Sequence, residues 1–378
     1  MDVNDFKSGI WIQAVGYRNF LPEKINHDFH WADSELNELL ESASHILGEL
    51  NAYAVLVPDV DVFIRAYVAK EAVVSSKIEG TQTTMQEAFM QENDLAPERK
   101  NDHLEVINYT AAMNDAIKEL KKLPLSNRLI KKAHQQLLQS VRGKHKTPGE
   151  FRRSPNWIGG SGLKDAVFIP PSHEHVDELM SDMELFLHNR NIHVPHLVRI
   201  AIAHYQFETI HPFLDGNGRV GRLLITLYLV SNGKLSKPLL YLSDFFERHK
   251  TLYYDNLMRV RTHGDLRQWL VFFLSGVIET GESAISTLKR IVILKERLLE
   301  DKVMLMGKKT TNAIPLLNYL FKHPATNTNQ ISKSLNLTHK TSGILISTFE
   351  EAGIVKEITG AARDRIFIFD AYLKIFRT

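Results

Sequence analysis

The segment 211–222 reads HPFLDGNGRVGR and gathers residue types that handle phosphate groups. Its glycine-rich turn, 216–218, opens an expected helix, where backbone N–H groups and the helix dipole favour an anion. Arg219 and Arg222 are three residues apart, so they share one helical face and could clamp phosphate oxygens. The segment therefore predicts a site for a phosphorylated ligand.

Two further side chains in this segment could take part in chemistry. His211 can accept a proton near neutral pH. Asp215, four residues on, is a hard oxygen ligand suited to the Mg²⁺ that accompanies a triphosphate. A base, a metal ligand, a phosphate-binding turn and two arginines thus fall within one short segment.

The three glycines of the segment also spell G-x-G-x-x-G, the fingerprint of dinucleotide-binding folds. They are Gly216, Gly218 and Gly221. That fingerprint needs a preceding strand in a βαβ unit. Residues 195–208 instead have the apolar period of a helix, and no parallel-strand pattern follows the segment. We therefore reject a dinucleotide fold.

The segment is similar to the signature of the Fic family: His, any residue, Phe, any residue, Asp or Glu, Gly, Asn, Gly, Arg, two variable residues, Arg. Every defining position matches. The resemblance covers about Leu104 to Leu274 and implies a mainly α fold with a Fic-type helical core and a β-hairpin flap at Gly159 to Pro171. The implied activity is that of a protein adenylyltransferase, which transfers AMP from ATP to a Ser, Thr or Tyr hydroxyl of a target protein and of itself.

The resemblance implies a role for each matched residue. His211 would deprotonate the target hydroxyl, and Asp215 would hold Mg²⁺ on the α- and β-phosphates. Arg219 would bind the α- and β-phosphates and Arg222 the γ-phosphate, while the flap would hold the target peptide by strand addition. Tyr254 would pack near the adenine, unless it is an ordinary core or surface aromatic. The residues expected to contact ATP are Glu79, His211, Gly216, Asn217, Gly218, Arg219, Val220, Gly221, Arg222 and Tyr254.

A second match lies upstream, where Ser75, Glu79 and Gly80 fit the family's inhibitory motif of Ser or Thr, three residues, Glu, then Gly or Asn. In the family such a Glu pairs with the second motif arginine, here Arg222, and keeps the γ-phosphate from binding productively. A carboxylate there would occupy the guanidinium donors that orient ATP. The plain alternative is an acidic residue on a solvated helix face. In some relatives this Glu positions a water, so a hydrolase that removes AMP stays open as an alternative activity.

Apolar spacing predicts the elements that position these residues. A helix capped by Asp33 or Ser34 is expected over 33–50, and a new helix is expected after a capping box at Thr84 and Glu87. Asn156 to Ile158 and Ala166 to Ile169 should pair as the one hairpin in the first 300 residues. The other expected helices are 60–77, two between 101 and 139, 174–189, 195–208, 218–230, 252–261 and 266–299.

The last seventy or so residues have the pattern of a separate winged helix-turn-helix unit. Lys and Arg outnumber Asp and Glu by ten to five in 308–378, so a DNA-binding regulator with a nucleotide-sensing core is an alternative function. The expected recognition helix lacks arginine, which favours a protein contact over base readout. The elements expected here are helices at 313–321, 328–335 and 340–352, a strand entered at 353–355, a turn at Gly360 and a second strand at 365–369.

Composition limits the remaining classes of protein. The chain has no Cys, which excludes disulfides, thiolate zinc sites and a Cys nucleophile. A formal net charge of +2 gives no overall attraction to nucleic acid or to an anionic membrane. No apolar run approaches the roughly 18 residues of a membrane span, and the N-terminus has no signal-peptide pattern. We therefore expect a cytoplasmic protein with no membrane partner.

The whole sequence divides into three expected parts. They are an N-terminal helical region that carries the inhibitory helix (1–100), a Fic catalytic core (101–300) and the winged-helix unit (301–378). The expected ligands are ATP, as substrate, and Mg²⁺. The expected partners are an unidentified target protein and, from the resemblance alone, a second copy of the chain.

Overall fold

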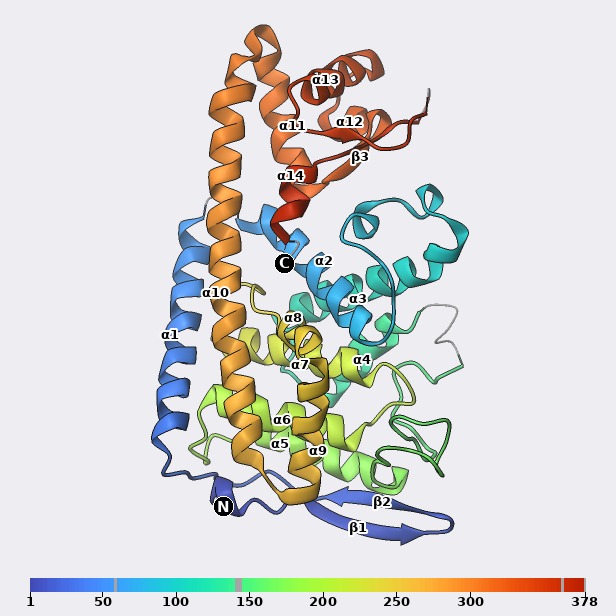
Figure 1. The fold of residues 1–378 in the computed structure, drawn as a ribbon, viewed down its shortest axis with the longest axis vertical. Coiled ribbons are helices and arrows are strands. Elements are labelled where there is room, and N and C mark those ends of the chain that lie inside the picture. Colours follow the sequence, from blue (N-terminus) through green and yellow to red (C-terminus); the bar gives the residue numbers. More distant parts are fainter. Residues whose placement is uncertain (58–59, 140–144, 362–363, 377–378) are drawn as a thin grey trace.

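The computed structural model describes residues 1–57, 60–139, 145–361 and 364–376. Helices make up most of this described part, with a β-hairpin near one end of the molecule and a small sheet near the other (Figure 1). No described helix has both the length and the apolar character needed to cross a membrane. The helices before residue 300 are α1 (Ser34–Leu56), α2 (Val60–Ile78), α3 (Lys100–Glu119), α4 (Asn127–Leu137), α5 (Val176–His188), α6 (His196–Ile210), α7 (Asn217–Ser231), α8 (Ser243–Arg248), α9 (Lys250–His263) and α10 (Leu266–Leu298).

Helices α6 and α7 lie at the centre of the core. Every residue of α6 from Leu197 to Ile210 is buried, and α7 is buried from Asn217 to Leu229 apart from Gly218. The long helix α10 packs beside α1 and runs along most of the molecule (Figure 1). Because both α6 and α7 are enclosed, the core fixes the two ends of the loop between them, which is the chemically informative segment.

A hairpin near the N-terminus contradicts the expectation of a single hairpin in the first 300 residues. Strands β1 (Gly9–Ala14) and β2 (Tyr17–Pro22) pair antiparallel, with Ala14 opposite Tyr17. Gly16 in the turn has a φ of 82°, a conformation that glycine adopts readily in two-residue hairpin turns. Neither strand alternates strictly between buried and exposed residues. The sequence therefore lacks the two-residue alternation of apolar and polar residues that predicts a strand.

In the structure the flap extends over residues 155–171, starting before the expected Gly159, and it contains one bridged pair of residues rather than two strands. Ile158 and Phe168 exchange backbone hydrogen bonds of 2.8 and 3.1 Å, and the carboxylate of Asp165 closes the tip of the loop. Phe20 of β2 donates its backbone N–H to the carbonyl of Ile169 at 3.0 Å. The N-terminal hairpin therefore packs against the end of the flap, where the ring centroids of Phe20 and Phe168 are 6.0 Å apart.

The capping box after Gly80 is present, but the helix expected to follow it is not. Thr84 and Glu87 exchange hydrogen bonds of 2.7 and 3.2 Å. Only a single 3₁₀ turn, Glu87–Phe89, follows them, and further short turns lead to α3. Glu87 also pairs with Arg99 at 2.9 Å, so its side chain ties this linker to the start of α3.

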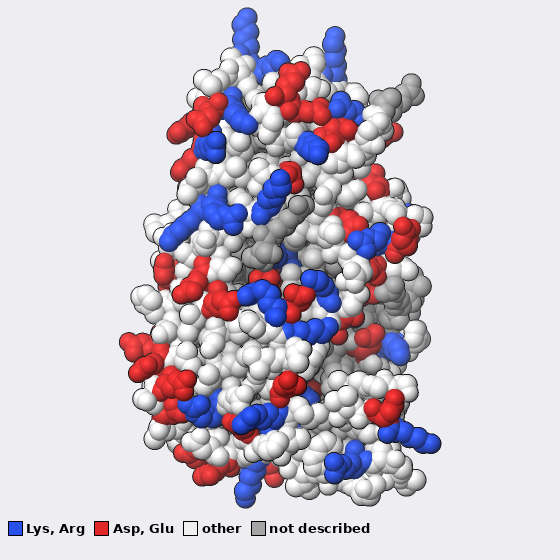
Figure 2. Space-filling model, in the orientation of Figure 1, with Lys and Arg blue, Asp and Glu red and all other residues white. Residues whose placement is uncertain are grey.

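The C-terminal region contains the three helices and the second strand expected for it and one additional short strand, but residues 353–355 form a turn and the first expected strand begins only at Lys356. Helices α11 (Thr310–Lys322), α12 (Thr328–Leu335) and α13 (His339–Glu351) accompany a sheet of order β3-β5-β4, built from β3 (Ala325–Asn327), β5 (Ile366–Ile368) and β4 (Lys356–Glu357), and α14 (Asp370–Leu373) follows. Its assignment as a winged-helix domain stays an interpretation. On the face in Figure 2, basic and acidic side chains are mixed over this region, with no single basic surface.

The C-terminal region packs against α2. The rings of Phe63 and Phe321 meet edge to face at a centroid distance of 5.5 Å, and those of Tyr67 and Phe376 do so at 5.3 Å. Their side chains belong to one continuous cluster of buried residues that also includes the core around α6 and α7. Helix α2 thus has the C-terminal region on its first half and the chemically informative loop near its last turn.

Candidate active site

The loop between α6 and α7 has two residues in the left-handed conformation. His211 ends α6 with φ 51° and ψ 61°, and Gly216 precedes α7 with φ 75°. Asn217 fixes the loop between them, because its side-chain amide donates to the Phe213 carbonyl and accepts from the Phe213 N–H, both at 2.8 Å. The side chain of Asn217 therefore shapes the loop, and only its backbone is left to face a ligand.

His211 is held in its neutral form. Burial, with help from the positive charges of Arg152 and Arg261, lowers the pKa of His211 to about 3. The Nδ1 atom is buried with no hydrogen-bond partner among the described residues, which leaves Nε2 as the nitrogen available to a substrate proton. A neutral imidazole is the form that can act as a general base, and an anionic ligand close by would raise its pKa toward neutrality.

The N-terminus of α7 meets the end of α2. Gly216 is its N-cap residue and provides no side-chain capping bond. A methyl group at position 218 would collide with the carboxylate of Glu79, so this carboxylate lies directly against the turn. Glycine at 218 therefore leaves room for the carboxylate of Glu79 beside the turn.

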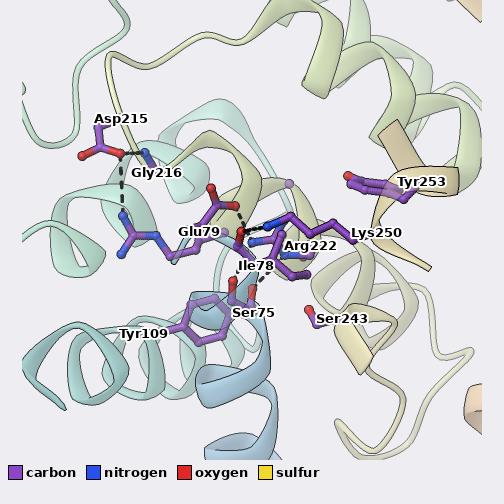
Figure 3. A network of polar contacts seen from close by, with 12 residues as sticks. Ser75, Ile78, Glu79, Tyr109, Asp215, Gly216, Arg222, Ser243, Lys250 and Tyr253 are labelled. Atoms are coloured by element: carbon purple, nitrogen blue, oxygen red, sulfur yellow. Dashed lines mark hydrogen bonds and ion pairs between the residues drawn. The ribbon is translucent and has the colours of Figure 1, made fainter. Parts of the chain in front are cut away.

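Arg222 makes three hydrogen bonds to the last turn of α2 and to the residue that follows it (Figure 3). Its Nε donates to Ser75 Oγ at 2.9 Å, and its Nη2 donates to the Ser75 carbonyl at 2.8 Å and to Glu79 Oε1 at 2.7 Å. Burial by itself would raise the pKa of Glu79, but the charge and hydrogen bond of Arg222, with the charge of Arg219, together outweigh burial and hold the pKa below its ordinary value. The Arg222 side chain is 2% exposed and that of Glu79 35%, so the carboxylate lies at the mouth of the site.

Polar side chains from three other helices hold α2 in this position, and Figure 3 shows the contact of one of them, Lys250, with Ile78. Lys250 at the start of α9 donates to the carbonyl of Ile78 at 2.6 Å, close to the C-terminal end of α2. Tyr109 and Ser243 donate to Glu71 at 2.8 and 2.6 Å, one turn before Ser75. Burial raises the pKa of Glu71 to about 7, so its charge changes near neutral pH.

Arg219 and Asp215 lie on the other side of the turn. Arg219 donates to Glu105 at 3.0 Å, and its Nη2 is 3.8 Å from Asp215 Oδ1. Asp215 accepts the N–H of Gly216 at 2.6 Å, and its side chain is 44% exposed. The described residues contain no cluster of three His, Asp or Glu side chains that could enclose a metal ion. A single accessible carboxylate does fit Mg²⁺, which commonly binds one or two carboxylates together with substrate phosphates and water.

Three further residues expected to contact ATP lie outside the glycine-rich turn: Val220 and Gly221 follow it in α7, and Tyr254 lies on α9. Val220 is buried in the core, and Gly221 packs against Glu208 of α6, so both belong to the packed side of α7. Tyr254 is 42% exposed and stays available to a ligand. Its neighbour Tyr253 is buried and hydrogen-bonded to His204 at 2.8 Å, so that tyrosine is part of the core.

Sequence reasoning missed His134, which supports the loop from α4. The N–H of Gly149 donates to His134 Nδ1 at 2.9 Å, so Nε2 carries the proton and donates to the Asp215 carbonyl at 3.0 Å. The imidazole also stacks on Phe213 at a centroid distance of 3.7 Å. Burial lowers the pKa of His134 to about 4 and keeps it neutral. No motif marks this histidine, because it lies within an ordinary amphipathic helix.

The fold and the site together define a mainly helical protein with a glycine-rich turn between a histidine and an arginine. Residues 37–118 match the family model described as Fic/DOC family N-terminal, and residues 124–229 match the model described as Fic/DOC family. The chain therefore belongs to the Fic family. These two matches place the inhibitory motif in the first region and the segment 211–222 in the second.

Relatives with the name protein adenylyltransferase Fic are similar to part of this chain. The one from Aedes aegypti is 36% identical over 125 residues, which are 33% of this chain and 22% of that protein. The one from Drosophila erecta is 30% identical over 203 residues, which are 52% of this chain and 37% of that protein. The chain thus matches well under half the length of these relatives.

Two solved structures have the same fold. A Fic family protein from Desulfovibrio desulfuricans G20 has a TM-score of 0.58 and 21% identity, and the match covers 90% of this chain and 97% of that one. A Fic domain containing signaling protein from Bacteroides thetaiotaomicron has a TM-score of 0.51 and 18% identity, with 68% and 97% covered. At these identities the likeness concerns the fold.

Proposed function

We propose that this protein is a Mg²⁺-dependent protein adenylyltransferase that its own helix α2 holds inactive. One observation carries the proposal: Arg222, which the family signature assigns to the ATP γ-phosphate, is bound by Glu79 and Ser75 beside an uncapped helix N-terminus. The names of the relatives from Aedes aegypti and Drosophila erecta support the same activity. The substrates are ATP and a hydroxyl group of a target protein.

The residues of the loop supply positioning, a base and charge stabilisation for the transfer. The oxygen of the target hydroxyl attacks the α-phosphorus of ATP, and the bond from that phosphorus to the bridging oxygen of the β-phosphate breaks. The hydroxyl proton goes to Nε2 of His211, and pyrophosphate leaves. The backbone N–H groups at the start of α7 and the guanidinium of Arg219 stabilise the charge on the phosphates. Tyr254, which is accessible, packs near the adenine.

Asp215 is the residue that would hold the magnesium ion. Its exposed carboxylate lies at the edge of the phosphate-binding turn. The ion would neutralise phosphate charge and favour departure of pyrophosphate. The described residues do not enclose a metal site, so the affinity for Mg²⁺ should depend on the presence of ATP.

The flap is the element that would bind the target protein. Val167 and Trp157 are 68% and 41% exposed on it, beside the single bridged pair of Ile158 and Phe168. An extended peptide could add its backbone to this short pairing, as peptides do at open sheet edges. Recognition of that kind uses backbone hydrogen bonds, so the flap alone does not restrict which hydroxyl is modified.

Transfer of labelled phosphate from ATP tests the proposed activity. The Glu79→Gly variant is incubated with Mg²⁺ and either α-labelled or γ-labelled ATP, and label is measured on the protein itself. We expect α-label alone to be transferred. Transfer of γ-label would indicate a kinase-like reaction and contradict the proposal. Absence of both labels would also contradict it and would favour AMP removal or the DNA-binding alternative.

A further inference from the structure

Arg152 binds three consecutive carbonyls of the His211 turn. Its Nε donates to the His211 carbonyl at 2.9 Å, its Nη2 to the Ile210 carbonyl at 3.2 Å, and its backbone N–H to the Pro212 carbonyl at 2.8 Å. The residue is 2% exposed. These carbonyls come at and just after the C-terminal end of α6, where no intrahelical donors are available to them.

The same guanidinium also binds both ends of the flap. Nη1 of Arg152 donates to the Ser154 carbonyl at 3.1 Å, and Nη2 donates to the Pro171 carbonyl at 2.6 Å. Ser154 immediately precedes the flap and Pro171 ends it. One side chain therefore joins the turn that carries the expected base to the two ends of the segment expected to hold the target.

The chemistry of these contacts suits a guanidinium and no other side chain. Every hydrogen bond of the Arg152 side chain goes to a backbone carbonyl, and it forms no ion pair with a described carboxylate. Burial lowers the pKa of Arg152 to about 10, which still leaves it charged at neutral pH. Arginine has five N–H donors in a planar fork, so it can reach carbonyls on several sides at once, whereas lysine has one nitrogen.

Two independent contacts join the same pair of segments. Asn156 of the flap donates its side-chain amide to the Phe213 carbonyl at 2.9 Å. Arg261 of α9 donates to the Glu208 carbonyl at 3.0 Å and lies over the ring of Phe168, 3.9 Å from its centroid. The turn and the flap are thus connected at several points, with Arg152 at the centre of the connections.

We propose that Arg152 is a positioning residue that couples the flap to His211, so that the bound target and the base are held as one unit. The inference rests on the proposed function for its catalytic consequence. His211 has a positive φ, which costs energy in a residue other than glycine and needs support from its surroundings. Arg152 gives that support through its hydrogen bonds to the carbonyls of Ile210 and His211.

The variant Arg152→Lys keeps the charge and removes the fork. With one nitrogen it cannot hold the turn and both flap ends together, so transfer should lose about 100-fold in kcat, as expected when a base is misplaced by about 1 Å. ATP binding should change less than about twofold, since Arg152 contacts neither Arg222 nor the start of α7. Arg153→Lys is the matched control, because its side chain is 87% exposed.

Hydrogen exchange tests the coupling without any assay of activity. In the unaltered protein, residues 154–171 and 209–213 should open together. The opening equilibrium constants of the two segments should agree within about threefold, and they should depend on urea concentration in the same way. In Arg152→Lys both segments should exchange at least about tenfold faster, while Arg153→Lys matches the parent. Independent opening in the unaltered protein, or faster exchange of one segment only in Arg152→Lys, would overturn the coupling.

Kinetics in the Glu79→Gly background complete the test. A fall in the rate constant of self-modification with unchanged ATP affinity supports the positioning role of Arg152. An unchanged rate constant in Arg152→Lys would overturn it. If the Glu79→Gly reference transfers no label, the proposed function has failed, and the hydrogen-exchange result still decides whether Arg152 joins the flap to the turn.

Discussion

Two buried arginines on either side of the same loop have different kinds of partner. Arg222 is bound by the carboxylate of Glu79, whose side chain is 35% exposed, and by Ser75 of the same helix. Arg152 is bound only by backbone carbonyls from its own region of the core. A ligand can replace a carboxylate at the mouth of a site, whereas carbonyls of a buried turn cannot leave without local unfolding. Arg222 is therefore suited to exchange partners, and Arg152 to keep them.

The contacts of Arg222 are suited to regulation, and those of Arg152 to positioning. The contacts between α2 and the site are polar and lie at the end of the helix, at Ser75 and Glu79, where Lys250 also binds the Ile78 carbonyl. A shift of that helix end would free Arg222 and leave the His211 turn intact. Loss of the Arg152 contacts would disturb the turn and the flap together.

His211→Ala should have the largest effect on transfer. Without the base, kcat in the Glu79→Gly background should fall by at least about 100-fold, and more than in Arg152→Lys, which only displaces the base. Quantified transfer of α-label from ATP measures the loss. His193→Ala, at an exposed position, is the matched control. A smaller loss for His211→Ala than for Arg152→Lys would contradict the roles given to the two residues.

Glu79→Gly should raise the rate of transfer. Removing the carboxylate frees a charge-assisted donor of Arg222 for the γ-phosphate, so we expect an increase of about tenfold or more. Initial rates of self-modification in the parent and the variant provide the measurement. Gln82→Gly introduces the same flexibility at a nearby exposed position and should leave the rate unchanged. Equal rates in parent and Glu79→Gly would show that α2 does not restrain the site.

Glu71→Gln should change the pH dependence of stability, and this is the smallest predicted effect. The pKa of Glu71 is raised by burial from 4.5 to about 7, so the folded state holds the proton more tightly than the unfolded state. Its contribution is fully present below pH 4.5 and is lost as the pH rises to about 7. Between pH 5 and 7.5 the parent should lose up to about 3 kcal/mol more unfolding free energy than Glu71→Gln.

Urea unfolding at the two pH values measures this difference. Glu208 also has a pKa raised to about 7 by burial, but it is present in both proteins, so the comparison isolates Glu71. Glu41→Gln, an exposed position on α1, should behave like the parent. Equal pH dependence in the parent and Glu71→Gln would show that Glu71 does not hold a proton in the folded protein.

The local signals of the sequence predicted most of the fold. Helix positions followed from apolar spacing, and the cap of α1 at Asp33 is observed, with its side chain accepting the Leu36 N–H. The segment 211–222 could be recognised from the sequence because all the residues of its motif are contiguous. The hairpin of β1 and β2 was missed, since its aromatic residues pack against the flap and do not alternate. The expectations of DNA binding, of a dimer and of AMP removal stay predictions.

The positioning residues could not be predicted, because their roles depend on contacts between distant parts of the chain. Arg152 and Arg153 are identical neighbours in sequence, but one is 2% exposed and the other has an 87% exposed side chain. His134 likewise resembles any histidine of an amphipathic helix, and only its contact with the Asp215 carbonyl distinguishes it. Such contacts cannot be predicted from residue type and local spacing.

The most direct test of the exchange of partners at Arg222 is calorimetric binding of ATP and of AMP to the parent and to Glu79→Gly. AMP has no γ-phosphate and should not compete with Glu79. We expect Glu79→Gly to bind ATP about tenfold or more tightly than the parent, with AMP affinity changed less than about twofold. An equal gain for both nucleotides, or no gain for either, would contradict the claim that Glu79 occupies the γ-phosphate position on Arg222.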